Sequence, residues 1–440
     1  MKRNGDRRKL SGGTVFMLIL SAVVLAGSAA VLIRLSSGAS VDLSRLSMNV
    51  LDLQDGTPRE QSAEPVREQT KSEEKKIYPE TAAQETKAPA AVSAPEQNKA
   101  EGSFTLTIGG SISLSDEVRK NCWNTDSKSC DYSDVMMLLA PEIRSDMNAV
   151  FTENLFSDSY KANDTVAPET AADLLKEGGF NAAACGFSQA FAKGTDGVEM
   201  TRLTMLERNI LPLGIRDPEE QDQLDIRTVG NVRTAFLQYT ANISSKTRKS
   251  MEKAAASGTV PEAEAGLIAE EIAAARNQGA EAVIVLFSWG KTGKDPDKSQ
   301  HELAAAAAEA GADLIVGSGS HIPQGAEYLA GKNGNKVLCV WSLGSLLSGD
   351  RANVKHMSGY LLHVTVRSDG QGGADILRPE YTPVYTWKYK QDGRYYYRCM
   401  AADQEAPDGM DSEQKKNLAK AEQAVTEALK GSPLTLRKHE

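Results

Sequence analysis

The chain has 440 residues and a net charge of -9, with 40% hydrophobic and 6% aromatic residues and a mean hydropathy of -0.38. This composition excludes a multi-span membrane protein, a collagen-like repeat and a small disulfide-dense scaffold. An isoelectric point near 5.4 also argues against a nucleic-acid partner, because binding to phosphates needs a field of Lys and Arg.

The first 33 residues predict a membrane anchor. Residues 1–13 carry five basic residues and one acidic residue, a net of +4, and are expected to form a cytoplasmic basic segment. Residues 14–33, TVFMLILSAVVLAGSAAVLI, contain no charge, and a helix of this length spans about 30 Å, the thickness of a bilayer core. We therefore expect a single-pass protein of the cell membrane whose C-terminal domain is extracytoplasmic. A cleaved signal peptide is the alternative, because small residues are dense at 26–30, although such signals usually have an apolar region of about 7 to 15 residues.

Residues 34–102 predict a disordered stalk. They contain a single aromatic residue, Tyr78, and five prolines among many Glu, Lys, Gln and Ser. Such a stretch buries too little apolar surface to offset its chain entropy. As a flexible coil it would hold the following domain about 45 to 50 Å from the membrane. Short helical pieces within 59–76 are the alternative, and the prolines limit their length.

The chain has five cysteines, an odd number for an exported protein. Cys122 and Cys130 enclose a polar loop and are the favoured disulfide pair in an oxidising compartment, with two reduced thiols as the alternative. Cys185 and Cys339 lie in apolar runs and are expected to be buried. Because the sequence has no CxxC and no Cys/His cluster with zinc-finger spacing, a structural zinc is not expected.

Short apolar runs alternate with amphipathic stretches from 103 to 400. Strands are predicted at 104–112, 149–156, 180–187, 232–240, 280–290, 312–321 and 336–347, and helices at 168–177, 198–209, 262–279 and 299–311. This alternation predicts an α/β layered domain, to which the strand-rich part at 360–400 adds a further sheet. Residues 401–440 predict a C-terminal helix, at 411–430, that packs outside the core, and a tail.

Ligands of such domains bind in the loops at the carboxyl ends of the strands. The candidate loops are Gly109-Gly110, Glu153-Asn154, residues 186–189, residues 288–290 and residues 317–321. We therefore expect the chemistry of this protein to lie in these loops.

These loops, in this order, resemble the CapA family of capsule or poly-gamma-glutamate synthesis proteins, over about residues 103–390. The segment AEAGADLIVGSGSHIPQGAEYL looks like the family's aGADlviGhHPHvlQgiE, and VWSLGSLL looks like its ySLGNf. The stretch at 186–198, GFSQAFAKGTDGV, lies over the family's ANNHalDyGeeGl. The resemblance implies a calcineurin-like metallophosphoesterase fold and an N-terminal anchor before an external domain.

The departures from the family fall on the positions that would hold metal. The family's ligands are replaced by Gly110, Phe156, Phe187, Ser188, Gln189, Ala192, Ser288, Ser318 and Gly319. Only Asn154 and His321 match, and Glu153 is a carboxylate that neighbours a matched position. A two-metal site needs several carboxylates and imidazoles, so we expect no bound metal and no cofactor.

Asn154, Glu153, Trp289 and His321 remain as candidate ligand-binding residues, and the catalytic residues stay unassigned. His321 as a hydrogen-bonded structural residue and Trp289 as simple packing are the alternatives. Residues 186–190 are similar to the GxSxG elbow of serine hydrolases, centred on Ser188, but no acid partner stands out.

The sequence thus predicts a membrane-anchored, extracytoplasmic CapA-like protein of envelope or capsule polymer biosynthesis, acting as a non-catalytic binding or scaffolding pseudoenzyme. Its expected partners are an anionic envelope polymer or the membrane proteins of capsule assembly. The alternatives are a CapA-like hydrolase or transferase acting on an anionic polymer with atypical site residues, and a purely structural partner of another membrane protein.

Overall fold

The computed structural model describes residues 102–121, 123–124, 129–132, 134–217, 219–220 and 223–439, which belong to one compact unit, Ser93–Glu440. The predicted cytoplasmic segment, the predicted anchor and all but the last residue of the predicted stalk lie outside these residues, as does Cys122. Within the described ranges, no helix has the length and apolarity that crossing a membrane requires.

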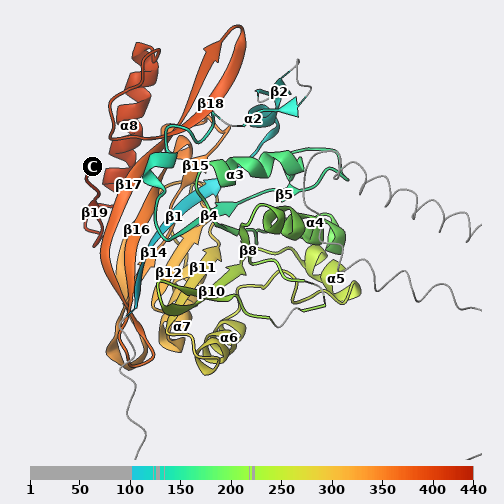
Figure 1. The fold of residues 1–440 in the computed structure, drawn as a ribbon, viewed down its shortest axis with the longest axis vertical. Coiled ribbons are helices and arrows are strands. Elements are labelled where there is room, and N and C mark those ends of the chain that lie inside the picture. Colours follow the sequence, from blue (N-terminus) through green and yellow to red (C-terminus); the bar gives the residue numbers. More distant parts are fainter. Residues whose placement is uncertain are drawn as a thin grey trace, which may run out of the picture. The chain divides into compact units, whose positions relative to one another are not determined.

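The strands of the described residues form two large sheets (Figure 1). The first has the order β18 (Arg394–Ala401), β17 (Ala374–Gln391), β16 (Ser358–Ser368), β1 (Ser103–Ile112), β4 (Met147–Thr152), β7 (Ala182–Ala184) and β8 (Leu211–Leu213), with β15 (Ser345–Leu347) also paired to β1 and β19 (Thr435–Leu436) to β17. The second has the order β13 (Ala326–Ala330), β14 (Lys336–Val340), β12 (Leu314–Ser318), β11 (Ala282–Ser288), β10 (Val232–Thr240) and β9 (Ile226–Val229). The strands β1, β4, β7 and β8 are parallel to one another, and so are β10, β11, β12 and β14.

Helices and short elements connect these strands. The α-helices are α2 (Asp116–Asn121), α3 (Asp173–Glu177), α4 (Gly194–Glu207), α5 (Ser245–Lys253), α6 (Ala265–Asn277), α7 (Lys298–Ala310) and α8 (Ser412–Ala428). The 3-10 turns are η3 (Ala140–Glu142), η4 (Glu169–Ala172), η5 (Lys332–Gly334) and η6 (Val354–Met357), and two small ladders pair β2 (Trp123–Asn124) with β3 (Ser129–Cys130) and β5 (Leu155–Phe156) with β6 (Val166–Ala167).

The two sheets pack face to face, with helices on their outer faces. Side chains that alternate along the strands, such as Leu106 and Ile108 of β1 and Ile284 and Leu286 of β11, fill the space between the sheets. The opposite faces bury α3 and α4 against the first sheet, and α6 and α7 against the second. The predicted layered α/β domain is therefore confirmed. The further sheet predicted at 360–400 is wrong, because β16, β17 and β18 extend the first sheet through the pairing of β16 with β1.

Two predicted strands are each divided in the structure. The run at 336–347 holds β14 in the second sheet and β15 in the first, because the chain turns at Gly344, whose φ of 73° is left-handed. A Cβ at this position would lie 2.7 Å from the Ser358 carbonyl oxygen. The run at 149–156 ends its main strand at Thr152, and the chain then leaves the sheet at Glu153 before β5 begins.

The C-terminal helix α8 confirms the predicted helix at 411–430 and begins with a capping box between Asp411 and Gln414. It packs on β17 and β16, where Val425 joins the core between the sheets, so the prediction that this helix packs outside the core is wrong. The tail that follows is fixed by Arg437, whose guanidinium donates to Nδ1 of the buried His363 at 2.8 Å. Burial, with the nearby charges of Arg437 and His439, lowers the pKa of His363 to about 3, so this imidazole is neutral in the folded protein.

Candidate functional site

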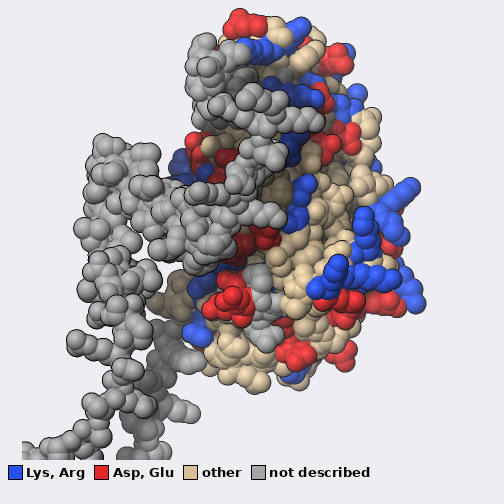
Figure 2. Space-filling model, turned by 90° about the vertical axis from the view of Figure 1, so that its right-hand side faces the viewer, with Lys and Arg blue, Asp and Glu red and all other residues tan. Residues whose placement is uncertain are grey.

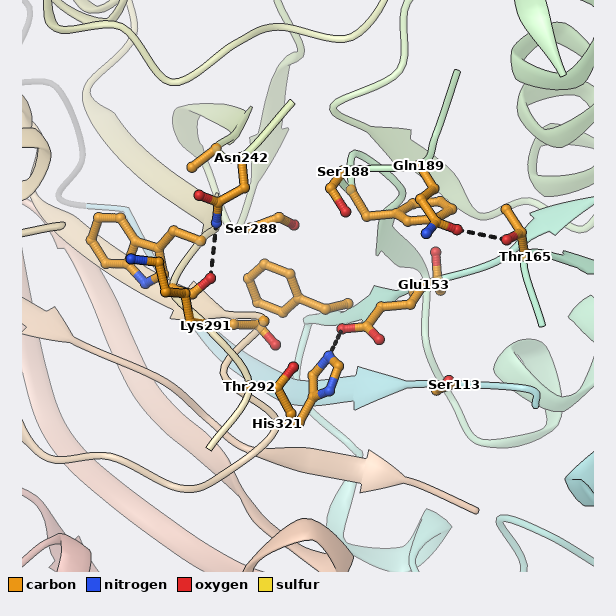
Figure 3. Close-up of a pocket in the computed structure, with 18 of the residues that line it drawn as sticks. Ser113, Glu153, Thr165, Ser188, Gln189, Asn242, Ser288, Lys291, Thr292 and His321 are labelled. Carbon is orange, nitrogen blue, oxygen red and sulfur yellow. Dashed lines mark hydrogen bonds and ion pairs between the residues drawn. The ribbon is translucent and has the colours of Figure 1, made fainter. Parts of the chain in front are cut away.

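A cavity of about 510 Å³ lies where the parallel strands of both sheets end (Figure 3). Each predicted loop after β4, β7, β11 and β12 contributes to it, and the segments after β1 and β10 add Ser113 and Asn242. Nine of its 19 lining residues are polar but uncharged: Ser113, Thr152, Thr165, Ser188, Gln189, Asn242, Ser288, Thr292 and Ser318. Four of the five predicted loops therefore meet at one place, whereas Gly109-Gly110 lies inside β1 and does not line the cavity.

At one end of the cavity the two sheets are joined at Gly186, which lies two residues after β7 of the first sheet. The Gly186 N–H donates to Gln238 Oε1 at 3.0 Å, and its carbonyl accepts from Gln238 Nε2 at 2.6 Å. The Ser288 hydroxyl donates to the same carbonyl at 2.5 Å. Gln238 on β10 and Ser288 on β11 continue the strand faces that fill the space between the sheets, which brings both side chains to Gly186. We call this set of three residues the Gly186 junction.

The Gly186 junction tolerates no side chain at position 186. A Cβ there would lie 2.7 Å from both the Gly214 carbonyl oxygen and Thr240 Oγ1, closer than real Cβ atoms approach other atoms. Gln238 is 2% exposed, so its amide would be costly to bury without these partners. The junction therefore holds the sheets at a short separation beside the cavity.

Glu153 and His321 form a second link between the sheets, inside the cavity. The Nε2 atom of His321 lies 2.8 Å from Glu153 Oε1. A dashed line marks this contact in Figure 3. Glu153 follows β4 of the first sheet, whereas His321 follows β12 of the second. The backbone of His321 has a left-handed φ of 58°, an unusual conformation for a residue other than glycine. The fold thus brings together two of the four residues that the sequence predicted as ligand-binding.

The charge state of His321 depends on Glu153. Burial disfavours the imidazolium, but the charge and hydrogen bond of Glu153, with a contribution from the charge of Asp350, outweigh it and raise the pKa of His321. Since the folded pKa lies above the unfolded value of about 6.5, the stabilisation from this pair is fully present below that pH. It is lost as the pH rises through the raised pKa.

The other two predicted residues do not present their polar groups to the cavity. Asn154 is 1% exposed; its Oδ1 accepts from the Leu114 N–H at 2.8 Å, and its Nδ2 donates to the Asp164 carbonyl at 3.1 Å. Trp289 borders the cavity, but its ring stacks on Phe287 with centroids 4.3 Å apart and its Nε1 donates to the Trp341 carbonyl at 2.9 Å. Both side chains therefore support the walls.

Sequence reasoning missed Gln238, Asn242 and Thr165. Gln238 carried a signal, because it is a polar residue on the face of a strand that Val232 and Phe236 otherwise make apolar. Asn242 and Thr165 carried none, since they lie in polar loops that only the fold brings to the cavity.

The buried cysteines agree with the sequence. Cys185 and Cys339 are buried and unpaired, as predicted, and so is Cys399. Pairing of β2 with β3 sets Cys130 opposite Trp123, the residue after Cys122. Because Cys122 lies outside the described residues, its disulfide with Cys130 stays a prediction.

Residues 105–350, more than half of the chain, match the family of bacterial capsule synthesis proteins, PGA_cap. The chain belongs to this family. The resemblance that the loop motifs indicated is therefore confirmed. Among curated proteins, none matches the sequence of this PGA_cap protein.

Two solved structures are similar to it at 11% identity. One is the crystal structure of a hypothetical protein from Thermus thermophilus, with a TM-score of 0.35, and the match covers 63% of this chain and 99% of that one. The other is the calcineurin-like phosphoesterase YfkN from Bacillus subtilis, with a TM-score of 0.36 and coverage of 74% and 99%. Sequence identities and TM-scores this low give no information about the site.

The backbone leaves no room for two of the metal ligands that the PGA_cap resemblance assigns. At Gly110, the position of the family's first Asp, a Cβ would lie 2.3 Å from the Gly344 carbonyl oxygen. At Gly319, a position of a family His, φ is 115° and a Cβ would lie 2.5 Å from the Trp289 carbonyl oxygen. A third position, Phe156, is fully buried in the core outside the cavity. The departures in this PGA_cap protein therefore involve the backbone as well as the side chains.

We predict that Gly186→Ala destabilises the folded domain by about 1–3 kcal/mol, because the methyl group forces the junction apart. Chemical denaturation monitored by tryptophan fluorescence measures this loss. Gly266→Ala, in helix α6 with open space around its Cβ, is the matched control and should be neutral or slightly stabilising. Equal stability of the two variants would contradict the role assigned to Gly186.

A second prediction concerns Glu153→Gln, which keeps the shape of the side chain but removes its charge. The pKa of His321 should fall, because the carboxylate that favours the imidazolium is gone. NMR titration of the imidazole measures the pKa. Asp350→Asn is the control and should lower the pKa less, since Asp350 contributes only a weaker charge effect. The stability difference between wild type and Glu153→Gln should be largest at acid pH and shrink as the pH rises, and a constant difference would count against the ion pair.

Proposed function

We propose that this PGA_cap protein is a membrane-anchored, extracytoplasmic component of envelope or capsule polymer biosynthesis that binds or scaffolds without catalysing hydrolysis. The observation that carries the proposal is the donor set of the cavity. Hydroxyl and amide groups are the commonest polar groups of its lining, and Glu153 and His321 inside it bind each other. The fold keeps the loop cluster of its family while the chemistry of the cluster differs.

The residues present do not fit a two-metal centre. Among the described residues, no group of three or more His, Cys, Asp or Glu side chains is close enough together to hold one ion. A dication that leaves water needs several carboxylates to compensate its charge, whereas hydroxyls of Ser288 and Ser318 are neutral. The Ser288 hydroxyl also donates to Gly186, so it is engaged in the junction.

A hydrolase or transferase acting on an anionic polymer is the second candidate, and the Glu153–His321 pair favours it. A carboxylate that orients an imidazole is an arrangement used in general acid–base catalysis. Ser188 gives no support as a nucleophile, because Figure 3 places it across the cavity from His321. The cavity contains an acid–base pair without an assigned nucleophile, so binding is the better supported function.

The partners that we propose are an envelope polymer and the membrane proteins that assemble it. In the described part of the face that Figure 2 presents, acidic and basic side chains lie side by side between broad uncharged areas. Such a surface suits contacts spread over polymer units and neighbouring proteins, since it lacks the single-sign field that binds any polyanion.

Elemental analysis of the purified full-length chain tests the metal part of the proposal. We expect well below one metal atom per chain, and no phosphodiesterase or amide-hydrolase turnover that responds to Mn²⁺ or a chelator. Glu153→Gln should leave the metal content unchanged, because Glu153 is paired with His321. One or two metal atoms per chain, reduced in Glu153→Gln, would overturn the proposal in favour of the hydrolase.

The membrane anchor is tested by charging the middle of residues 14–33. Leu20→Arg with Val24→Arg should release the chain from the membrane fraction, since each Arg at the centre of a spanning helix costs about 2.5–3.5 kcal/mol. Leu20→Ile with Val24→Ile is the control and should stay with the membranes. Mass spectrometry of the wild-type protein gives an independent measurement, because a mature chain that starts after residue 26 would identify a cleaved signal peptide instead.

A further inference from the structure

The charges around the cavity do not favour an anionic ligand. The net charge of the groups around the cavity is -1 when His321 is protonated, from three carboxylates (Glu153, Asp164, Asp297) and two cations (Lys291, His321). The net charge is more negative when His321 is neutral. The Nζ atom of Lys291 in the lining lies 3.4 Å from Asp297 Oδ2. The charge of Lys291 therefore already has an acidic partner. A carboxylate or phosphate placed in the cavity would therefore meet no net attraction.

The uncharged polar groups fit a different ligand. Ser188 and Thr292 offer hydroxyls, which can both donate and accept a hydrogen bond. Gln189 offers its Nε2 as a donor and Asn242 its Oδ1 as an acceptor, since their other amide atoms bind Thr165 and the Gly290 carbonyl. Phe151 and Phe187 add apolar surface beside them. Hydroxyls, amides and an aromatic wall together complement a sugar ring, which carries hydroxyl groups on its edge and C–H groups on its faces. A volume of about 510 Å³ lies within the range of small-molecule sites.

Ser318 points to the same ligand. It continues the strand face that Leu314 and Val316 turn toward the space between the sheets, and it lines the cavity. Ser318 is 1% exposed, and its Oγ has no hydrogen-bond partner among the described residues. A buried hydroxyl without a partner is unfavourable, and a ligand hydroxyl or amide in the cavity would satisfy it.

We propose that the cavity binds an uncharged sugar unit of an envelope glycan, with Ser318 as one of its hydrogen-bonding residues. This inference rests on the proposed function, because it names the class of polymer unit that the cavity receives. Charged groups of such a polymer would lie outside the cavity. The His321–Glu153 pair then serves as a polar contact for the sugar.

The test measures binding of the full-length chain in detergent to neutral oligosaccharides of hexose and N-acetylhexosamine units, with poly-gamma-glutamate as the anionic probe. We expect a neutral oligosaccharide to bind with little dependence on salt, since no ion pair is formed. Ser318→Ala should weaken this binding about two- to tenfold, the effect of one hydrogen bond. The melting temperature of the Ser318→Ala variant should stay the same or rise, because the unpartnered hydroxyl is removed.

Thr259→Val is the matched control. Thr259 is also fully buried with an unpartnered hydroxyl, but it does not line the cavity, so its removal should leave sugar binding unchanged. Failure of every neutral oligosaccharide to bind, or equal affinity in wild type and Ser318→Ala, would overturn the inference. Salt-sensitive binding of poly-gamma-glutamate alone would overturn it while leaving the proposed function standing, and absence of binding to both kinds of polymer would count against both proposals.

Discussion

The short separation of the two sheets at Gly186 is the constraint on which the site depends. Parallel strands of each sheet end at this edge, and side chains of ordinary size would hold the sheets apart. A glycine allows Gln238 to bind both the N–H and the carbonyl of residue 186, and Ser288 adds a second donor to that carbonyl. The cavity opens beside this contact, so its lining residues lie at fixed positions relative to each other.

The same contact explains why a position of a family metal ligand has a different function in this chain. The resemblance places a His of the family at Ser288. In this chain the Ser288 hydroxyl donates to the Gly186 carbonyl at 2.5 Å. The position therefore contributes a contact between the sheets here.

Much of the fold was predictable because periodicity reports burial. Helix α7 occupies 298–310 where 299–311 was predicted, and it ends before Gly311, whose φ is 110°. The location of the site was predictable too, because parallel strands bring their carboxyl ends to one edge. Glu153 and His321 lie at this edge and contact each other, although 168 residues separate them in the sequence.

The function of individual polar residues was less predictable. Asn154 matches its family position by identity, yet both of its amide atoms bind backbone groups. An amide suits a metal, a ligand or a backbone equally well, so the residue type does not distinguish these uses. The division of 336–347 between two sheets was also not predictable from the sequence, because both halves are apolar and only the turn at Gly344 separates them.

The glycines at 110 and 319 give the substitutions a common physical basis. The backbone of Gly344 occupies the space that a side chain at 110 would need, and the backbone of Trp289 does the same at 319. A carboxylate or imidazole restored at either position would meet these carbonyl oxygens before it reached the cavity. The close packing of these loops therefore excludes a carboxylate or imidazole at these two positions.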